Sequence, residues 1–322
     1  MCLRRARSAL FAALSLLVLC DAAAQYPSRP IRLFVGFPPG GGPDIVARLL
    51  ASRLSDALGQ PVVVENRVGG TGTIAGEAAA KSPPDGHSLL VGHDGLFVIN
   101  PHLYKEMPID PNRDLVPVTS LVSNGFFLAI NPSVPAHDFR EFIEYARRAT
   151  PPLQYGSGGN GSQHHLTMER LKARAGINMV HVPYKGGAPA TTATVAGEVA
   201  AMMSGTSTAG QIKAGRLRAI AFTGPKRSRV LPDVPTIAEF YPDFVMVQWY
   251  GLFAPAGTPE PVTARLRAET GRILELPDVR EKLSNAGGVE PWITTPEEFA
   301  VEMRSEFATY GKLVKEVGAK ID

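Results

Sequence analysis

Cysteine is nearly missing from this sequence of 322 residues, which contains only Cys2 and Cys20. Both lie within the first 24 residues, where three early arginines precede the apolar run Ala9–Leu19 and the small residues Ala22–Ala24. This order is typical of an export signal that is cleaved before Gln25. Cleavage would leave a chain without thiols, which excludes disulfides, cysteine nucleophiles and cysteine metal sites and suits an oxidising compartment.

Long apolar segments and an excess of one charge are also missing. The run Ala9–Leu19 is too short to anchor the chain across a bilayer, and no later segment is long and apolar enough to do so. A lipid-anchored precursor through Cys20 is the alternative, but Leu19 stands where a small residue normally precedes a lipidated cysteine. The formal charge is +3, and it falls to +1 without the signal. No polybasic patch remains, so we expect no nucleic-acid partner and no membrane-surface partner.

Repeats and low-complexity stretches are absent as well, and the residues after the signal alternate between strand and helix patterns. These 298 residues are enough for two domains with separate cores. The alternation favours α/β architecture with largely parallel sheets. The expected strands are, in chain order, Ile31–Phe37, Val62–Glu65, Leu89–His93, Phe126–Ile130, Leu153–Ser157, Met179–Pro183, Val199–Met203, Leu217–Thr223 and Tyr250–Ala254.

Two glycine-rich turns, about 115 residues apart, are the strongest local signals. In the first, the strand Ile31–Phe37 runs into Gly40–Gly42, and Asp44 is expected to cap a helix with one apolar face. In the second, the strand Leu153–Ser157 runs into a turn almost without side chains, and Ser162 is expected to cap the next helix. Helix N-termini with bare backbone amides bind carboxylate or phosphate groups. The alternative is tight packing of helix on sheet, for which glycine merely permits close approach.

The C-terminal stretch contains one expected strand and three expected helices, which cannot readily form a core alone. We therefore expect them to pack on the first sheet. The chain would then cross between domains twice, near residues 120–124 and 247–251. Residues 25–122 together with 248–322 would form one domain, and residues 123–247 the other. A cleft between two such domains is the usual layout of a hinge-closing binding protein.

The spacing of residues does not match the familiar motifs of catalytic or cofactor-binding sites. Neither glycine turn contains the G-x-S-x-G of a nucleophile elbow. The run Gly40–Gly42 lacks the further glycine of a dinucleotide fingerprint and the Gly-Lys-Ser/Thr of a P-loop. His164 and His165 are adjacent, so on a helix their side chains diverge by about 100° and cannot readily share a metal ion. We therefore expect no enzyme, no cofactor and no metal site, and an enzyme on the same fold is the less favoured alternative.

Three other residues have two interpretations each. Asp94 lies at the carboxyl end of an expected strand, where open α/β sheets bind ligands, but an Asp before Gly95 also forms turns. In a pocket, Asp94 would disfavour a second carboxylate and favour an amino or hydroxyl group. His165 is either a helix-surface residue or a donor in the pocket, and Trp249 either packs in a core or lines the cleft.

A series of short motifs, spread from Tyr26 to the C-terminus, resembles the motifs of the Bug family and follows the family order. Bug proteins are the periplasmic substrate-binding proteins of tripartite tricarboxylate transporters. The motifs are Tyr26–Ile31, Gly36–Asp44, Val64–Arg67, Pro84–Gly86, Tyr155–Ser162, His181–Gly186, Leu231–Thr236 and Ala254–Pro259.

The resemblance implies a type II periplasmic-binding-protein fold, in which two α/β domains close over a small solute that carries a carboxylate. It implies a periplasmic receptor without a cofactor that delivers this solute to the membrane permease subunits of a tripartite transporter, and we expect a monomer. The alternative is a sensor subunit that presents its closed form to a signalling partner.

The resemblance also implies binding residues, because in the family the backbone amides and hydroxyls of the two glycine turns hold one carboxylate. Carried over to this sequence, with a further turn at the far end, these residues are Phe37, Gly41, Gly42, Pro43, Asp44, Ser157, Gly158, Asn160, Gly161, Ser162, Lys185, Gly186, Gly187 and Ala188.

Two departures from the family pattern bear on the solute. Many relatives have Thr where this chain has Pro43, which removes a hydroxyl and an amide donor. Two positions that are often acidic are Ala200 and Ser204 here, so a preference for a cationic group is relaxed if Ser204 lies at the pocket edge. Asp94 would restore that preference if it faced the pocket.

Overall fold

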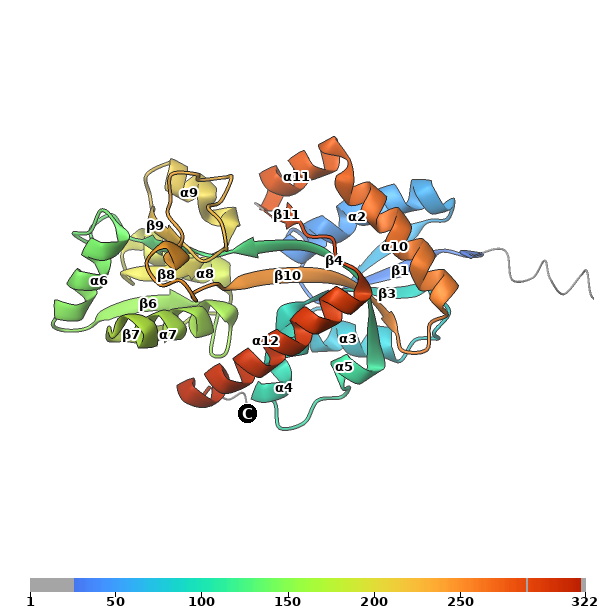
Figure 1. Cartoon of the computed structure of the whole chain (residues 1–322), viewed down its shortest axis with the longest axis horizontal. Coiled ribbons are helices and arrows are strands. Elements are labelled where there is room, and N and C mark those ends of the chain that lie inside the picture. Colours follow the sequence, from blue (N-terminus) through green and yellow to red (C-terminus); the bar gives the residue numbers. More distant parts are fainter. Residues whose placement is uncertain (1–25, 288, 320–322) are drawn as a thin grey trace, which may run out of the picture.

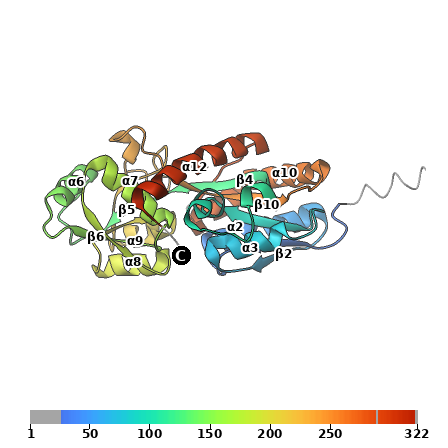
Figure 2. The same cartoon turned by 90° about the horizontal axis from the view of Figure 1, so that it is seen from below.

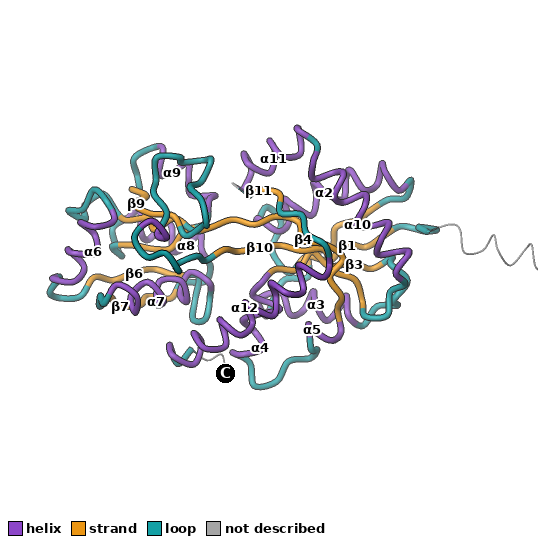
Figure 3. The backbone as a smooth tube through the Cα atoms, viewed as in Figure 1, coloured by secondary structure: helices purple, strands orange, loops and turns teal. Residues whose placement is uncertain are grey.

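Two β-sheets organise the chain, and two long neighbouring strands run between them (Figures 1 and 3). The computed structural model describes residues 26–287 and 289–319, so the export signal expected over residues 1–24 lies outside it. None of the described helices is both long and apolar enough to cross a membrane. Each sheet contributes side chains to hydrophobic cores on both of its faces.

The first sheet has the strand order β11-β4-β10-β3-β1-β2. Its strands are β1 (Ile31–Val35), β2 (Val62–Asn66), β3 (Ser88–His93), β4 (Leu115–Gly125), β10 (Val247–Pro255) and β11 (Glu290–Pro291). The helices of this half are α2 (Gly42–Leu58), η1 (Gly70–Gly72), α3 (Thr73–Ala80), η2 (Gly95–Ile99), α4 (Asn100–Leu103), α5 (Pro111–Asp114), α10 (Glu260–Glu275), α11 (Pro277–Gly287) and α12 (Pro296–Val317).

Alternating side chains divide the first sheet between two cores, because successive residues of a strand point to opposite faces. Leu33 packs in the core that contains Leu50 of α2 and Leu266 of α10. Phe34, the next residue, packs in the core that contains Ala79 of α3 and Phe299 of α12. Full burial of a Leu or Phe side chain stabilises the folded chain by about 1.5–3 kcal/mol. The C-terminal helices therefore complete the first half, on both faces of its sheet.

The second sheet has the strand order β7-β6-β8-β5-β9. Its strands are β5 (Phe127–Ile130), β6 (Leu153–Ser157), β7 (Met179–Pro183), β8 (Ala201–Ser204) and β9 (Arg218–Phe222). The helices of this half are α6 (Phe139–Arg148), α7 (Gln163–Ala175), α8 (Gly187–Ala196), η3 (Thr206–Thr208), α9 (Ala209–Lys213) and η4 (Ile237–Glu239).

Both sheets are mixed, so the expectation of largely parallel sheets was wrong. Strands β1, β2 and β3 pair in parallel, as do β6, β7 and β8. Strand β10 is antiparallel to both β3 and β4, and β5 is antiparallel to both β8 and β9. The reason lies in the connections, because a chain that leaves one sheet and later returns to it places strands of opposite direction side by side.

Strands β4 and β10 connect the two halves (Figure 3). They pair in antiparallel register from Leu115 opposite Pro255 to Gly125 opposite Val247. Beyond Gly125 the chain enters β5 of the second sheet, and it returns to the first sheet at Val247. The two passages are therefore adjacent in space although they are more than 100 residues apart in sequence.

Helix α12 lies beside these two strands and reaches the second half (Figures 1 and 2). Its first turn is a capping box, in which the Thr295 hydroxyl accepts from the Glu298 amide and the Glu298 carboxylate accepts from the Thr295 amide. Near its other end, the Tyr310 hydroxyl lies 3.4 Å from Nε2 of Gln163 in α7. One helix thus contacts both halves at the place where the chain passes between them.

Candidate functional site

Two neighbouring cavities lie between the halves. Their volumes are about 270 and 520 Å³, and His164, Gly187 and Gln248 line both of them. Gln248 comes from strand β10, at the boundary between the two sheets. We call the smaller one the first cavity and the larger one the second cavity.

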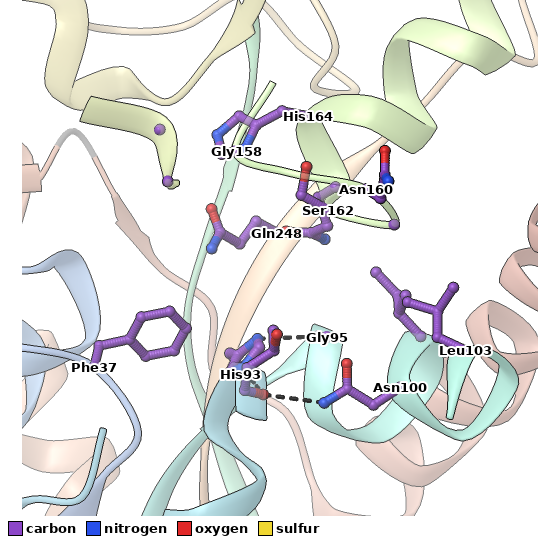
Figure 4. A pocket seen from close by; sticks show the side chains of 16 residues that line it. Phe37, His93, Gly95, Asn100, Leu103, Gly158, Asn160, Ser162, His164 and Gln248 are labelled. Atoms are coloured by element: carbon purple, nitrogen blue, oxygen red, sulfur yellow. Dashed lines mark hydrogen bonds between the residues drawn. The ribbon is translucent and has the colours of Figure 1, made fainter. Parts of the chain in front are cut away.

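The first cavity has one wall from each half (Figure 4). Phe37 and the ends of β3 and α4 form one wall, and the glycine turn before α7 forms the other. Its lining residues are Phe37, Thr71, His93, Gly95, Ile99, Asn100, Leu103, Gly158, Asn160, Gly161, Ser162, Gln163, His164, Gly186, Gly187 and Gln248.

The second cavity lies between the first glycine turn and α8. Its polar wall residues include Thr191 and Thr192 of α8, Thr208 before α9, and Tyr250 of β10. Among the described residues that line either cavity, none is a Lys, Arg, Asp or Glu. Only uncharged dipoles therefore face a bound solute directly.

The first glycine turn contains its own anion. Helix α2 begins at Gly42 with Gly41 as its N-cap, so the expectation that Asp44 caps the helix was wrong. Asp44 lies within the first turn of α2, is 2% exposed, and accepts from the Gly40 amide at 2.9 Å, from Arg48 Nε at 2.9 Å and from Asn66 Nδ2 at 2.8 Å. The carboxylate therefore compensates the positive end of the α2 dipole from inside the protein.

The electrostatics of Asp44 agree with that role. Burial alone would raise the pKa of its carboxyl, but the hydrogen bonds from Arg48, Asn66 and Gly40 outweigh burial and hold the pKa below its ordinary value. Asp44 is therefore ionised at neutral pH. The turn offers an incoming anion less positive potential than a turn with bare amides would.

The second glycine turn is organised by three side chains. The Ser162 hydroxyl caps α7 by accepting from the His165 amide at 3.3 Å, which confirms the predicted cap. The Gly159 amide donates to Ser157 Oγ at 3.0 Å, and the Gly161 amide donates to His165 Nδ1 at 3.1 Å. Among the predicted binding residues, Gly161 thus has an amide that is already used within the turn, and so does Ser162, whose amide donates to the Gly159 carbonyl at 3.2 Å.

Four other amides of this turn remain available. They belong to Gly158 and Asn160 and to the first two residues of α7, Gln163 and His164, and no described residue accepts a hydrogen bond from them. All four residues line the first cavity. An N-terminus of this kind carries a partial positive charge and points its amides outward. The second turn can therefore hold an anion without a cationic side chain.

His165 supports the turn from behind and does not line either cavity. Its ring is buried and stacks on His181, with the ring centroids 3.9 Å apart and the planes at 6°. Burial, with a smaller contribution from His181, lowers the pKa of His165 to about 4. The ring is therefore neutral at neutral pH, which is the form in which Nδ1 accepts from Gly161.

Ser157 lies in the same layer behind the turn. Its side chain is fully buried, and its Oγ lies 2.6 Å from Nε2 of His181. The distance is that of a nucleophile and its base. Ser157 does not line either cavity, however, so its hydroxyl does not face a bound solute. The geometry indicates a structural bond that holds the end of β6 to β7.

Asp94 does not face the cavities either. It is fully buried and accepts from the Gly95 amide at 2.8 Å, from the Trp249 amide at 3.3 Å and from Nε2 of Gln163. It lies where the end of β3, strand β10 and the start of α7 meet. Trp249 is buried in a core and does not line the cleft.

The sequence-predicted binding residues separate into two groups. Those on the cavity walls are Phe37, Gly41, Gly42, Gly158, Asn160, Gly161, Ser162, Gly186, Gly187 and Ala188. Those that line neither cavity are Pro43, Asp44, Asp94, Ser157, His165, Lys185 and Ser204. Lys185 is exposed, and Ser204 is fully buried, with its hydroxyl 2.9 Å from that of Thr208. Ser204 therefore does not lie at the pocket edge.

Several wall residues escaped the sequence analysis. His164 packs between Gly158 and Gly187, and burial lowers its pKa to about 4, so it is a neutral dipole in the wall. Gln248 is a polar residue between Val247 and Trp249 at the start of an apolar strand, a signal that could have been read. His93 and Asn100 also line the first cavity, and each stands at the end of an apolar run, so they gave a signal of the same kind.

The fold and the site define a class of protein. Two mixed α/β halves, joined by two adjacent strands and separated by an uncharged polar cavity, are the architecture of a periplasmic solute-binding protein. Residues 46–319 match the family model described as the tripartite tricarboxylate transporter family receptor. The chain belongs to this receptor family, and its type II periplasmic-binding-protein fold, expected from the sequence, is confirmed.

Curated relatives resemble the chain over nearly its whole length. A UPF0065 protein from the tcbD-tcbE intergenic region of Pseudomonas sp. (strain P51) is 39% identical, over 90% of this chain and 87% of the relative. Protein BugT of Bordetella pertussis is 35% identical, over 93% of each chain. The resemblance to the Bug family is therefore confirmed.

Solved structures give the same result. A protein of R. palustris, solved with adipate, is 32% identical with a TM-score of 0.81, over 92% of this chain and 99% of the other. The periplasmic binding protein BugD is 33% identical with a TM-score of 0.77, over 92% and 99%. MatC from Rhodopseudomonas palustris, with bound malate, is 33% identical with a TM-score of 0.77, over 90% and 100%.

Proposed function

We propose that this receptor captures a small metabolite with a carboxylate group and delivers it to a tripartite tricarboxylate-type transporter. The observation that carries this proposal is the N-terminus of α7, where four amides without a described partner line the first cavity. Adipate and malate in two similar proteins support the same class of solute.

The carboxylate is held by dipoles alone in this proposal. Hydrogen bonds from amides to an ionised group are shorter and stronger than those to a neutral group. The two turns contribute unequally, because Asp44 already compensates the first helix whereas no described side-chain carboxylate accepts from the first-turn amides of α7. The second turn is therefore the principal anion site, and the first turn shapes the wall opposite.

The domain division is part of the proposal. We assign residues 25–122 and 248–322 to one domain and residues 123–247 to the other, with β4 and β10 as the hinge. The two separate sheets support this division. Bending at the hinge would close the second turn and Phe37 over the solute, which excludes water and strengthens each polar contact.

The proposal also covers export and chemistry. We propose that the signal is cleaved near Ala24, that the mature receptor is monomeric, and that it releases its solute unchanged to the permease subunits. The absence of a catalytic role is supported by the position of the Ser157–His181 pair behind the second turn, away from both cavity walls.

A ligand screen on the mature protein tests the proposal. Mono- and dicarboxylates, amino acids and aromatic acids are added separately, and the melting temperature is measured, because a solute that prefers the folded state raises it by mass action. We expect carboxylates to raise it and the solute to be recovered unchanged by mass spectrometry. Stabilisation by neutral solutes alone would contradict the anion site, and a chemically altered solute would contradict the receptor role.

A single isosteric change localises the site. Asn160→Asp places a negative charge in the first cavity and keeps the size of the side chain, so it should weaken carboxylate binding by at least about 10-fold. Its melting temperature without solute is the control for folding, since Asn160 is exposed in the turn. Unchanged affinity would show that the carboxylate binds elsewhere.

A further inference from the structure

We infer that Gln163, held by Asp94, presents a hydrogen-bond acceptor to the first cavity and so selects a carboxylate solute that also carries a hydroxyl or N–H group. This inference rests on the proposed function and narrows its solute class. Asp94 is a positioning residue in it, because it acts on the solute only through Gln163.

The orientation of the Gln163 amide is set by its neighbours. Its Nε2 donates to Oδ2 of Asp94 and lies 3.5 Å from the backbone oxygen of Val247. Both oxygens of Asp94 already accept from backbone amides, those of Gly95 and Trp249. A backbone carbonyl can only accept, and a carboxylate likewise, so the NH2 end of Gln163 must face this side.

The other end of the amide is therefore directed away from Asp94. No described residue donates a hydrogen bond to Oε1 of Gln163, and Oε1 is not one of the buried side-chain atoms without a partner. Gln163 lines the first cavity, and only 9% of its surface is exposed. The cavity is thus the place where this acceptor can find its donor.

The acceptor lies next to the anion site. Gln163 is the first residue of α7 and follows the cap Ser162 directly, so its own amide is among those available to a carboxylate. A carboxylate oxygen opposite Oε1 would be repelled, whereas a hydroxyl or N–H would be bound. A binding site that presents an acceptor without a partner in the protein favours solutes with the matching donor over analogues that lack it.

The test compares matched acids on the mature protein by calorimetry. Succinate, malate and aspartate differ only in a hydrogen, hydroxyl or ammonium group next to one carboxylate, and glutarate with 2-hydroxyglutarate extends the series by one carbon. We expect the wild type to bind at least one substituted acid about 10-fold more tightly than its unsubstituted partner. Equal affinities within both series would overturn the inference and leave the receptor proposal intact. Failure of every carboxylate to bind would overturn both.

Variants separate this role from a structural one. Gln163→Met keeps the size of the side chain and removes the acceptor, so the affinity ratio should fall to about 1. Asp94→Asn allows the Gln163 amide to turn round, because Asn can donate, and should reduce the ratio as well. Gln154→Met, on the exposed side of β6, is the matched control and should keep the wild-type ratio. The inference would be overturned if Gln163→Met kept the wild-type ratio of affinities for the substituted and unsubstituted acids. The comparison of acids on the wild-type protein tests the inference even if a variant fails to fold.

Discussion

The indole Nε1 of Trp249 donates a hydrogen bond to Oε2 of Glu306 at 2.6 Å. Trp249 belongs to strand β10 and Glu306 to α12, so this bond ties the helix to a strand that carries the chain between the halves. Burial, followed by the nearby charge of Asp94, raises the pKa of Glu306 to about 8, although the bond from Trp249 opposes the rise and Glu302 adds to it. The carboxyl is therefore largely protonated in the folded protein at pH 7.

The first prediction concerns the pH dependence of stability. Between about pH 4.5 and pH 8 the folded state keeps the Glu306 proton, whereas the unfolded state releases it. The contribution of Glu306 to the free energy of unfolding should therefore fall as the pH rises through this window, by up to about 1.4 kcal/mol per pH unit, and it is best measured above about pH 6.5, because the lowered pKa values of His164 and His165 act in the opposite direction below that pH. Denaturant titrations at several pH values measure the slope.

Glu306→Gln should flatten that slope, because an amide does not titrate. Glu297→Gln, at an exposed position in the first turn of the same helix, should leave it unchanged. The same slope in wild type and Glu306→Gln would contradict a protonated Glu306.

The second prediction compares two helix caps, Ser162 on the wall of the first cavity and Thr295 at the start of α12. Ser162→Ala and Thr295→Ala each remove a hydroxyl that accepts from a helix amide, and each should lower the free energy of unfolding by about 1 kcal/mol. Only Ser162 lines a cavity, so only Ser162→Ala should also weaken carboxylate binding, by about 3- to 10-fold. Calorimetry on both variants measures this, and equal losses of affinity would show that the cap acts through stability alone.

The third prediction isolates charge in the second turn. Gly161 has φ +70°, and a Cβ there would lie 2.5 Å from Cδ1 of Leu103 in the other half. Asn and Asp both tolerate such a φ better than other residues and are equal in size. Gly161→Asp should therefore bind a carboxylate at least about 10-fold more weakly than Gly161→Asn. If the two variants bind equally, the turn contributes shape but no electrostatic recognition.

The fourth prediction compares two glycines of the C-terminal part. A Cβ on Gly251 of β10 would lie 2.5 Å from Cε1 of Phe299, a buried residue of α12, so Gly251→Ala should destabilise the protein by about 1–3 kcal/mol. Gly271, inside α10, has nothing within 4 Å of such a Cβ. Gly271→Ala should stabilise by about 0.4–1 kcal/mol, because the unfolded chain loses freedom and the helix gains propensity. Thermal unfolding measures both, and a stable Gly251→Ala would show that α12 shifts freely.

Strands with a local sequence pattern between turn signals were predictable, whereas a strand that depends on a distant pairing partner was not. Residues Leu153–Ser157 and Met179–Pro183 form the strands that the pattern predicted. Strand β4 was missed, because Pro117 stands within it, and its pairing partner Phe253 follows a register shift that accommodates the proline. Pairing across 130 residues leaves no local signal.

The binding site likewise has features that the sequence predicted and features that it did not. The turn before α7 and its Ser162 cap were predictable, because capping depends on a few consecutive residues. Asp44 was wrongly predicted as the N-cap, which is Gly41, because its partner Asn66 lies on the neighbouring strand. His165 was proposed for the pocket and His164 was not, although His164 lines both cavities. Which of two adjacent histidines faces a cavity depends on the packing of the whole helix.

The sequence by itself determined the receptor family, the two glycine turns and the α/β class, because these depend on motifs and on the local periodicity of apolar residues. Only the tertiary structure decided which amides stay available, because Asn66 of β2 and the stacked ring of His181 hold the side chains of Asp44 and His165 where they accept from amides four residues away. It also decided that Asp94 acts on Gln163 and not on the cavity, because residues 94 and 163 meet only when the two halves are joined. Hydrogen-bond partners of buried groups are set by distance in space, which the order of residues does not encode locally.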